Sequence, residues 1–415
     1  MLSQFYPPII GGIEQHVRNL SAELVARGHE VAVATLWQAG LLEFENDRGV
    51  RVYRIRGTLQ RAAWLFSEKQ RRHAPPFPDP ELVAGLRNVI VRERPDVVHA
   101  HNWLVHSFLP LKVWSGARLV LTLHDYSLVC AKHRFMYHDS VCDGPGFKCF
   151  GCATAHYGLL RGVPTVLANW SMGFAERAAV DMFLPVSQAV AVGNGLVDSS
   201  LRFQVIPNFI PDDVAVVETR DGSYDARLPA EDYLLFVGDI SPDKGVPVLL
   251  KAYAEMASPI PLVLIGRRNA ATPKDLGRNV ILLENWPHDA VMHAWSKSMM
   301  GLAPSVVPEA CPTVVMEAMA TGRPVIASRI GGTVDLVSDE ETGLLVPPGD
   351  ASALRYAMER MILDLDLRTR MGQAAKRRVL EFQAKSVVPR IEQVYRQIVE
   401  RRQANRELEP IGTIE

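Results

Sequence analysis

The sequence of 415 residues has no stretch of about 18 uninterrupted apolar residues, the length that a helix needs to span a membrane. Its first dozen residues, MLSQFYPPIIGG, lack the basic start and the unbroken apolar core of a secretory signal. The net charge of −1 provides no overall field that would attract nucleic acid or an anionic membrane. These absences predict a cytoplasmic protein without a nucleic-acid partner.

Two further absences narrow the class of protein. The sequence has no repeat of short period, no low-complexity tract and no G-x-G-x-x-G followed by an acid in a first β-α-β unit. The missing glycine signature argues against a dinucleotide-dependent oxidoreductase.

Cysteine is scarce as well, and four of the five cysteines fall between Cys130 and Cys152. In a reducing compartment such clustering favours a metal site over disulfides.

The sequence is rich in short β-branched runs that alternate with amphipathic helical stretches. One helical face, around Val17 and Leu24, ends at Gly28, where a C-cap glycine belongs. Apolar runs separated by helices are typical of parallel strands covered on both faces. The predicted strands lie at residues 31–34, 97–100, 119–123, 182–186 and 205–206, and then at 233–237, 262–265, 280–283, 299–303, 325–327 and 344–346.

The length of the chain exceeds the size at which single cores divide, so two domains are expected. The charged, weakly hydrophobic stretch 211–232 is suited to a linker. We therefore predict an α/β protein with two doubly wound, Rossmann-like domains, 1–210 and 233–386, that face each other across a cleft. A C-terminal helix and tail, 387–415, can cross back. Few residues precede the Gly11-Gly12 turn, so either the first strand is very short or the chain starts late.

The segment PEACPTVVMEAMATGRPVIAS, residues 308–328, is the most informative. Glu309 and Glu317 lie eight positions apart, and a helix is predicted to start at Pro312 and to end at Gly322. Free N–H groups at a helix N-terminus suit a diphosphate, and carboxylates suit sugar or ribose hydroxyls. The alternative is a pair of solvated surface glutamates.

This segment resembles the E-x7-E motif of retaining glycosyltransferases with the GT-B fold, specifically glycosyltransferase family 4. Further marks in the family's order are the Gly11-Gly12 loop, LTLHD at 121–125, PVSQAV at 185–190, VIPNFI at 205–210, FVGDISPDKG at 236–245, the Gly331-Gly332 turn and GLLVPPGD at 343–350. The resemblance implies a retaining hexosyltransferase that uses a nucleoside-diphosphate sugar, UDP more often than GDP, and no catalytic metal. The acceptor would be a glycan, a lipid-linked sugar or a small molecule, in cell-surface polysaccharide or glycoconjugate synthesis.

The resemblance assigns the chemistry to three residues. Glu309 would bind hydroxyls of the donor sugar, Lys244 would neutralise the diphosphate leaving group, and His124 would lie near the reacting carbon. For His124 a purely structural role is the alternative. A front-face mechanism, in which the leaving phosphate accepts the proton of the acceptor, is implied, because no carboxylate nucleophile can be placed from the sequence.

The remaining roles that the resemblance implies concern donor binding. Glu317 would hold the ribose, Trp286 would frame the base, and the backbone of Gly11 and Gly12 would close over the phosphates. The backbone near the sugar and phosphates would be that of Cys311, Pro312, Thr313 and Val314.

The chain departs from the family at Asp239, because family members usually carry arginine directly after the glycine of the diphosphate loop. An acid beside a diphosphate is unfavourable unless it turns away or meets a cation. Arg267 and Arg268 follow the strand 262–265 and are the candidates to supply that charge. The alternative is that both are solvated surface residues.

The clustered cysteines form a C-x11-C-x6-C-x2-C pattern made by Cys130, Cys142, Cys149 and Cys152. The terminal C-x2-C has zinc-ligand spacing, and four thiolates would complete a tetrahedral structural site. This pattern favours a structural zinc over free thiols, an iron–sulfur cluster or disulfides. The loop follows His124 and is expected to shape the acceptor side.

Residues 61–80 combine apolar and basic side chains, namely Trp64, Leu65, Phe66, Lys69, Arg71 and Arg72. Such a segment can dock on the inner face of an anionic membrane that carries a lipid-linked acceptor. A mobile acceptor loop and a solvated helix are the alternatives.

Two other functions share the predicted architecture. One is a nucleotide-sugar epimerase. The other is a non-catalytic nucleotide-sugar-binding protein, and the presence of Glu309 and Lys244 argues against it.

Overall fold

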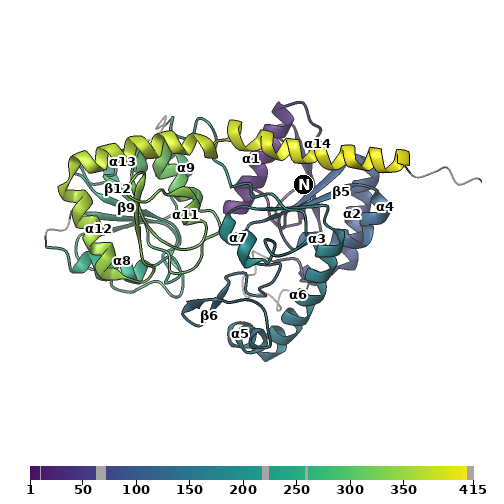
Figure 1. Ribbon diagram of the computed structural model, residues 1–415, viewed down its shortest axis with the longest axis horizontal. Coiled ribbons are helices and arrows are strands. Elements are labelled where there is room, and N and C mark those ends of the chain that lie inside the picture. The colour runs from purple at the N-terminus through teal and green to yellow at the C-terminus, as the bar shows by residue number, and fades with distance from the viewer. Residues whose placement is uncertain (10, 62–71, 217–223, 258–259, 409–415) are drawn as a thin grey trace, which may run out of the picture. The chain divides into compact units, whose positions relative to one another are not determined.

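The computed structural model describes residues 1–9, 11–61, 72–216, 224–257 and 260–408. They form two compact units. The first comprises Met1–Val186, Val190–Ile206 and the chain from Val387 onward, and the second comprises Ser187–Ala189 and Pro207–Ser386. Each unit is a sheet flanked by helices (Figure 1). In the described ranges, no helix is both long and apolar enough to cross a membrane.

The sheet of the first unit is parallel except for one edge strand. Leu2 forms parallel bridges with both Ala34 and Ala100 and so joins the two halves of this sheet. The strands are β1 (Ala32–Leu36), β3 (Val50–Ile55), the antiparallel edge β2 (Phe44–Asp47), β4 (Val97–Ala100), β5 (Arg118–Leu123) and β8 (Met182–Pro185). If Leu2 is counted as the first strand, the parallel strands follow the order 3-2-1-4-5-6 of a Rossmann fold.

The helices of this unit follow the predicted alternation. Helix α1 ends where expected, because Gly28 adopts a φ of +89° and the next amide, that of His29, donates to Leu24 O at 3.0 Å. The elements outside the sheet are α1 (Gly12–Ala26), η1 (Leu59–Arg61), α2 (Pro80–Glu93), α3 (Leu104–Phe108), η3 (Leu109–Leu111), α4 (Lys112–Ser115), the hairpin β6 (Met136–Tyr137) and β7 (Ser140–Val141), α5 (Lys148–Tyr157), α6 (Leu159–Ala179), α7 (Gln188–Gly193) and α14 (Ala384–Leu408).

The predicted strand at 205–206 is wrong. Phe203 makes a single parallel bridge to Phe183 of β8, and the Ile206 amide donates to Pro185 O, but no strand forms. The next residue, Pro207, has no amide N–H with which to continue the ladder. The chain passes from the first unit to the second at this point.

The second unit has a six-stranded, fully parallel sheet, and each strand lies within one residue of its predicted position. The strands in sheet order are β11 (Val280–Leu283), β10 (Leu262–Ile265), β9 (Leu234–Val237), β12 (Met300–Ala303), β13 (Val325–Ser328) and β14 (Gly343–Val346). This is again the order 3-2-1-4-5-6, with its switch point between β9 and β12. The prediction of an α/β protein with two doubly wound sheets is therefore confirmed.

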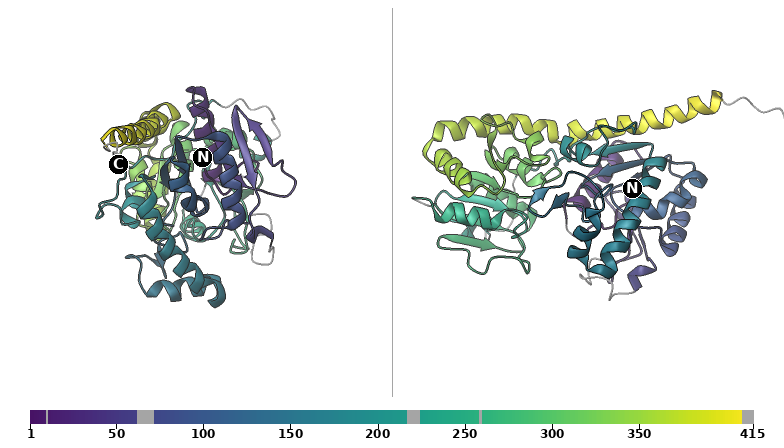
Figure 2. Two further views of the ribbon diagram at one scale, coloured as in Figure 1. Left: turned by 90° about the vertical axis from the view of Figure 1, so that its right-hand side faces the viewer. Right: turned by 60° about the horizontal axis from the view of Figure 1, so that its bottom comes forward.

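Helices cover both faces of this second sheet, as the right-hand view of Figure 2 also shows. On one face, Leu234, Phe236 and Leu264 pack in a buried cluster with apolar side chains of α8 (Val246–Ala254) and α12 (Ala351–Leu363). The other helical elements are η4 (Asp225–Arg227), α9 (His288–Lys297), α10 (Thr313–Ala320), α11 (Thr333–Leu336), α13 (Leu365–Arg378) and η5 (Val379–Phe382). The strand ends at the switch point are thereby held by a rigid core.

The loops after β9 and β12 approach each other closely at Gly245. This glycine has a φ of +73°, and a Cβ built on it would lie 1.8 Å from Pro304 O. A side chain there is excluded both by the backbone conformation and by the contact. The approach of the two loops therefore requires glycine.

We predict that Gly245→Ala destabilises the second unit more than Gly277→Ala does. Gly277 also has a positive φ, +85°, but a Cβ there would meet nothing within 4 Å. The control should lose about 1–2 kcal/mol from backbone strain alone, and Gly245→Ala about 1–3 kcal/mol beyond that. Urea unfolding of both variants measures the difference, and equal losses would contradict the steric argument.

Candidate functional site

The switch point of the second sheet brings together two loops that carry predicted site residues. Lys244 lies on the loop after β9, and Glu309 lies on the loop after the neighbouring strand β12. Sheets of this type bind ligands at the carboxyl ends of their strands where the strand order reverses. A binding site is therefore expected at these two loops.

Lys244 and Glu309 are in direct contact although 65 residues separate them in the chain. The Lys244 Nζ lies 2.6 Å from Glu309 Oε1, and the Ser305 Oγ donates to the same oxygen at 2.5 Å. The Glu309 side chain is only 17% exposed, so this charge-assisted hydrogen bond is partly shielded from water. Ser305, which the sequence reasoning missed, fixes the carboxylate from within its own loop.

The backbone at Glu309 is held by the predicted Gly331-Gly332 turn. The Gly332 amide donates to Glu309 O at 2.6 Å. A Cβ on Gly331 would lie 2.3 Å from Glu309 O, and one on Gly332 would lie 1.9 Å from Ala310 O. Because these two residues are glycines, the turn can lie in direct contact with the backbone of the Glu309 loop. This contact positions the Glu309 side chain.

Helix α10 begins at Thr313 with Pro312 at its N-cap, close to the prediction. The first amides of a helix, here from Thr313 and Val314 onward, have no acceptor within the helix and can bind an anion. Cys311, just before the helix, is buried, and its carbonyl accepts a hydrogen bond from Asn208 Nδ2 at 3.0 Å. Burial raises the pKa of the Cys311 thiol to about 12, so it adds no negative charge to this helix start.

Glu317 lies inside α10 and is buried, with 8% of its surface exposed. Its Oε1 lies 3.0 Å from His288 Nε2, at the start of α9. The hydrogen bond that His288 donates to the Glu317 carboxylate, together with the negative charge of that group, raises the pKa of His288 above the usual value although burial opposes the shift. His288 was not recognised from the sequence, and its position directly after the predicted Trp286-Pro287 pair was the available signal.

Trp286 is half-buried in the loop between β11 and α9. The Tyr224 ring packs edge-on against it at 5.2 Å between centroids, and the Arg227 guanidinium lies 5.7 Å from its ring centre. Within the described ranges, the Trp286 Nε1 is buried and has no hydrogen-bond partner. A buried indole N–H normally has an acceptor, so this group is suited to meet one on a ligand.

The unusual Asp239 meets a cation. Arg267 Nε lies 3.1 Å from Asp239 Oδ1, and Arg268 Nε lies 3.4 Å from Glu284 Oε2. Both pairs are largely exposed, and such pairs contribute little to stability by themselves. The Asp239–Arg267 pair is the arrangement expected if Arg267 supplies the positive charge that the chain lacks at position 239. Arg268 pairs with a different acid.

In the first unit, His124 lies in a cluster of buried imidazoles. Its Nε2 is 3.0 Å from His101 Nδ1, and ligand nitrogens of His16, His101 and His124 all lie within 4.8 Å of one another. The His99 and His101 rings lie 4.2 Å apart between centroids and are tilted by 34°, and His99 makes hydrogen bonds with Thr122 Oγ1 and Tyr395 OH, each at 2.6 Å.

Burial lowers the pKa of His16, His99 and His101 well below the usual value, and interaction with neighbouring imidazoles, and for His99 and His101 with the N-terminal amine, adds to the shift. These imidazoles are therefore neutral at physiological pH. The sequence reasoning singled out only His124. His99 lies in β4, the strand that pairs with β5, and His101 directly follows it. The carboxyl ends of neighbouring parallel strands share one edge, which was the missed signal.

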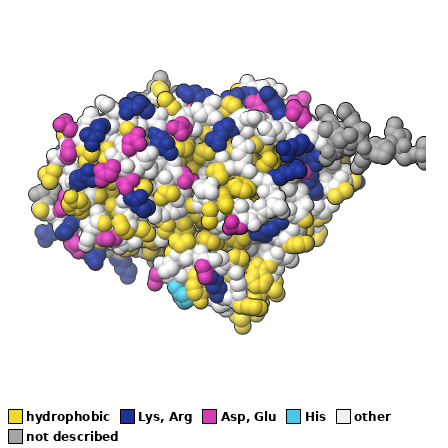
Figure 3. Space-filling view, in the orientation of Figure 1, with side chains coloured by type: hydrophobic (Ala, Val, Ile, Leu, Met, Phe, Trp, Pro, Cys, Tyr) yellow, Lys and Arg dark blue, Asp and Glu magenta, His cyan; other side chains and the backbone are white. Residues whose placement is uncertain are grey.

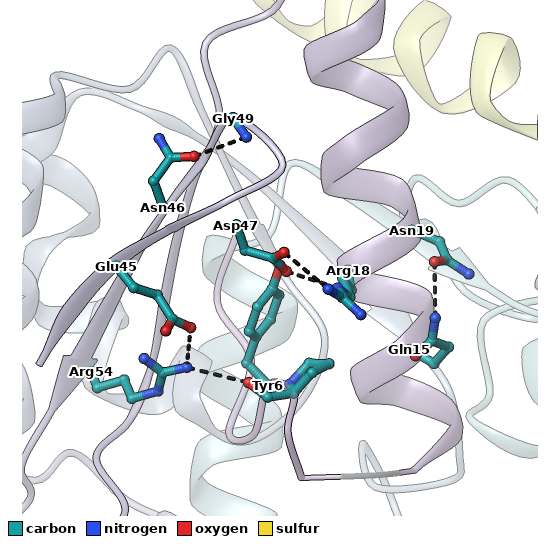
Figure 4. Close-up of polar contacts among 10 residues, drawn as sticks. Tyr6, Gln15, Arg18, Asn19, Glu45, Asn46, Asp47, Gly49 and Arg54 are labelled. Carbon is teal, nitrogen blue, oxygen red and sulfur yellow. Dashed lines mark hydrogen bonds and ion pairs between the residues drawn. The ribbon is translucent and has the colours of Figure 1, made fainter. Parts of the chain in front are cut away.

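The predicted Gly11-Gly12 turn leads into α1. Gly11 is the N-cap and Gly12 the first helical residue, and a Cβ on Gly12 would meet nothing within 4 Å. The loop before the turn is anchored by polar contacts (Figure 4). Tyr6 OH donates to Asp47 at 2.9 Å, and Arg18 of α1 makes two hydrogen bonds to the same carboxylate.

Arg54 of β3, whose side chain is 1% exposed, anchors the same loop from below. It donates to the carbonyl oxygen of Pro7 at 3.2 Å and pairs with Glu45 at 2.5 Å (Figure 4). The start of α1 is thus fixed by β2 and β3.

Two further predictions concern the clustered cysteines and the membrane-docking segment. The four clustered cysteines lie in the segment between β5 and α6 and line one small cavity. Of the proposed membrane-docking segment, residues 62–71, which include Trp64, Leu65, Phe66, Lys69 and Arg71, lie outside the described residues. Arg61, at its edge, pairs with Glu81 at 2.7 Å.

Comparisons with known proteins agree over nearly the whole chain. The family described as "Glycosyltransferase Family 4" matches residues 10–214, and "Glycosyl transferases group 1" matches residues 226–378. The chain is 24% identical over 405 residues to an uncharacterised glycosyltransferase of Methanocaldococcus jannaschii, covering 92% of this chain and 93% of that protein.

Solved structures share the fold. Sucrose-phosphate synthase from Thermosynechococcus elongatus superposes with a TM-score of 0.72 at 22% identity, covering 96% of this chain and 98% of that chain. Anabaena HepE in complex with UDP-glucose superposes with a TM-score of 0.67 at 17% identity, covering 95% and 98%. The two halves of the chain, each with its own sheet, thus both have counterparts of known fold.

We predict that the His288 imidazole titrates above about 6.5, the usual histidine value, and that Glu317→Gln returns its pKa to that value or below. The raised pKa means that the pair stabilises the unit fully below pH of about 6.5 and loses this contribution as pH rises through the folded-state pKa. NMR titration of the imidazole measures this, with Glu284→Gln as the control. An unchanged His288 titration in Glu317→Gln would show that the contact is not made.

Proposed function

We propose that this chain, which belongs to the family-4-type glycosyltransferases with the GT-B fold, transfers a sugar from a nucleoside-diphosphate donor held by its second unit. The observation that carries the proposal is the Lys244–Glu309 contact at the switch point of the second sheet, beside the start of α10. Lys244 supplies a cation, Glu309 supplies a carboxylate, and the start of α10 supplies free backbone amides. These are the groups that a sugar diphosphate requires.

The charge that develops on the leaving diphosphate determines the role of Lys244. Breaking the bond between the sugar and the diphosphate leaves negative charge on the β-phosphate, which fixed N–H dipoles and a cation stabilise. Without a ligand, Glu309 holds the Lys244 ammonium in place at 2.6 Å. A bound diphosphate would share this ammonium and the amides at Thr313 and Val314.

The nucleoside would be held by Glu317 and Trp286. His288 orients the Glu317 carboxylate through one oxygen, and a carboxylate can accept several hydrogen bonds, here from ribose hydroxyls. The buried Trp286 Nε1 would gain an acceptor from the base or ribose. We favour UDP as the nucleotide, a choice supported by the fold shared with HepE, whose structure contains UDP-glucose.

We propose that transfer retains the anomeric configuration by a front-face route. The Glu309 carboxylate already binds Lys244 and Ser305 through one oxygen, which lowers its nucleophilicity and suits it to bind sugar hydroxyls instead. His124, whose Nε2 lies 3.0 Å from His101 Nδ1 among other buried imidazoles, is proposed as the first unit's contribution to the reacting sugar. The acceptor is proposed to be a glycan or lipid-linked sugar used in cell-surface polysaccharide synthesis at the inner face of the membrane.

Thermal-shift screening of UDP- and GDP-sugars, followed by incubation of the binding donor with candidate acceptors, tests the function. A selective donor should raise the melting temperature, and NMR of the product should show a retained anomer. Inversion at C2 of the donor without transfer would instead identify an epimerase. Donor binding with neither reaction would identify a binding protein.

We predict that Glu309→Ala lowers kcat about 100-fold or more and largely spares donor affinity, because its contacts should strengthen in the transition state. Glu317→Ala should instead weaken nucleotide binding about 10- to 100-fold, because it removes charge-assisted hydrogen bonds. Steady-state kinetics and calorimetric titration separate the two effects. The control is Glu255→Ala, which replaces an exposed glutamate on the loop after α8. Near-normal turnover and affinity in both test variants would show that the site is misplaced.

The Asp239–Arg267 pair leads to a separate prediction. Arg267→Ala should weaken binding of UDP about 10- to 100-fold, at least as much as Lys244→Ala, because Asp239 is left with an uncompensated charge beside the diphosphate. Asp239→Arg should partly rescue the Arg267→Ala variant by restoring the positive charge. Calorimetric titration measures the affinities, with the exposed Arg278→Ala as the control. An unchanged affinity of the Arg267→Ala variant for UDP would show that Arg267 does not offset the charge of Asp239.

A further inference from the structure

From Cys130 onward, the segment between β5 and α6 has a small buried core. Its hairpin, β6 and β7, has two residues in each strand, of which Met136 alone is buried. Tyr126, Leu128 and Val129 are buried nearer to β5, and beyond them Ala131 and Ala153 form a small cluster with Val166 of α6 and a few partly buried neighbours. A two-stranded hairpin of this size is marginal in water by itself, so another interaction must hold it.

Apolar side chains of this segment and of the following helix α6 are exposed. Phe147 of the segment is 90% exposed, and on α6 Leu160 is 91% exposed and Phe174 is 78% exposed. Figure 3 shows hydrophobic side chains gathered at the lower end of the visible face, where Figure 1 places α5 and α6. These apolar side chains are not buried and add no stability to the segment.

The backbone of the segment is also unusual. His133, Phe135 and His138 all have positive φ values, of 64°, 51° and 52°. Residues other than glycine adopt this conformation at an energetic cost and keep it only where the surroundings enforce it. Three such residues within six positions indicate a tightly constrained loop.

The four clustered cysteines are placed where such a constraint is needed. All four line a single cavity of about 30 Å³, which is room for one water-sized occupant. Cys130 precedes the hairpin and Cys142 directly follows β7. Cys149 and Cys152 lie in the first half of α5, three residues apart and so on one face of the helix.

Backbone amides approach two of the four sulfurs. The Gly146 amide donates to Cys149 Sγ at 3.4 Å, and the amides of Lys132 and Phe135 donate to the sulfur of Cys130. Hydrogen bonds of this kind orient the ligands of a metal. The thiols of Cys142 and Cys152 instead donate to the carbonyl oxygens of Gly144 and Met136, at 3.3 and 3.7 Å, and would give up these contacts on losing their protons. Lys132 also lines the cavity, and Lys148, which lines it too, pairs with Asp143.

We propose that Cys130, Cys142, Cys149 and Cys152 bind one structural zinc ion that holds this segment together. All four cysteines are free of disulfides. Among the described His, Cys, Asp and Glu side chains, the one group of three or more whose ligand atoms all lie within 4.8 Å of one another is His16, His101 and His124, so the four sulfurs lie further apart than bound ligands do. Zinc–sulfur bonds of about 2.3 Å would draw the sulfurs to about 3.8 Å from one another.

The binding step is balanced by proton release. Each thiol loses its proton as its sulfur binds zinc, so zinc uptake releases protons to the buffer and no oxidant is required. Four protein ligands fill the tetrahedral positions and leave none open for a substrate, as in structural rather than catalytic zinc sites. This site is independent of the proposed transferase reaction.

Elemental analysis of the full chain, purified without a metal-binding tag, tests the proposal. We expect about one zinc per chain, and loss of most of it in Cys149→Ser and in Cys152→Ser, together with a lower melting temperature. Cys311→Ser is the matched control, because Cys311 is buried in the second unit, away from the cluster, and this variant should keep its zinc. Loss of zinc in the control as well would overturn the assignment to the cluster.

A second measurement covers the case in which the cysteine variants do not fold. Zinc in the wild-type protein is exchanged for Co²⁺, which should give the charge-transfer and visible bands of a tetrahedral four-thiolate site. Mass spectrometry under non-reducing conditions counts the free thiols of the metal-free chain. Bands of an octahedral oxygen-ligated site, iron with sulfide, disulfide-bonded cysteines, or a folded wild-type protein without metal would each overturn the proposal.

Discussion

The second unit depends on the close approach of two backbone segments at its switch point. Gly245, before α8, lies against Pro304 O, after β12, at a separation that no other residue could tolerate. This approach puts the loops after β9 and β12 side by side, and Lys244 and Glu309 meet only because of it. The Gly331-Gly332 turn presses on the same Glu309 loop from another strand end. Glycines thus build the site by letting main chains touch, and the charged side chains then occupy positions that the main chain has set.

Charge in this unit is arranged in pairs. Asp239 pairs with Arg267, Glu284 with Arg268, Glu309 with Lys244 and Glu317 with His288. A diphosphate would therefore not meet isolated acids, and the Lys244 cation is held in position before any ligand arrives. Preorganised charge of this kind stabilises a developing negative charge without a reorganisation step. The first unit shows a different chemistry, because burial lowers the pKa of His16, His99 and His101, and His99 and His101 make hydrogen bonds instead of ion pairs.

The two units also differ in how their irregular segments are stabilised. The loops of the second unit lie against a six-stranded sheet with a well-buried core. The segment between β5 and α6 of the first unit has a small core, exposed apolar side chains and strained residues, and four cysteines around one cavity. Where burial cannot offset the conformational entropy of a loop, a metal–ligand cluster is an established alternative.

The sequence by itself determined the local structure of this protein. The period of its apolar residues specified the parallel strands of the second sheet to within one residue, and Pro312 and Gly322 marked the ends of α10, because such patterns depend on neighbouring residues only. Tertiary structure alone decided the partners: Lys244 with Glu309, His288 with Glu317, and His124 with His101. It also reduced the first strand to Leu2 and left residues 205–206 outside the sheet. Each of these depends on strand order and on contacts between distant segments, which no local periodicity encodes.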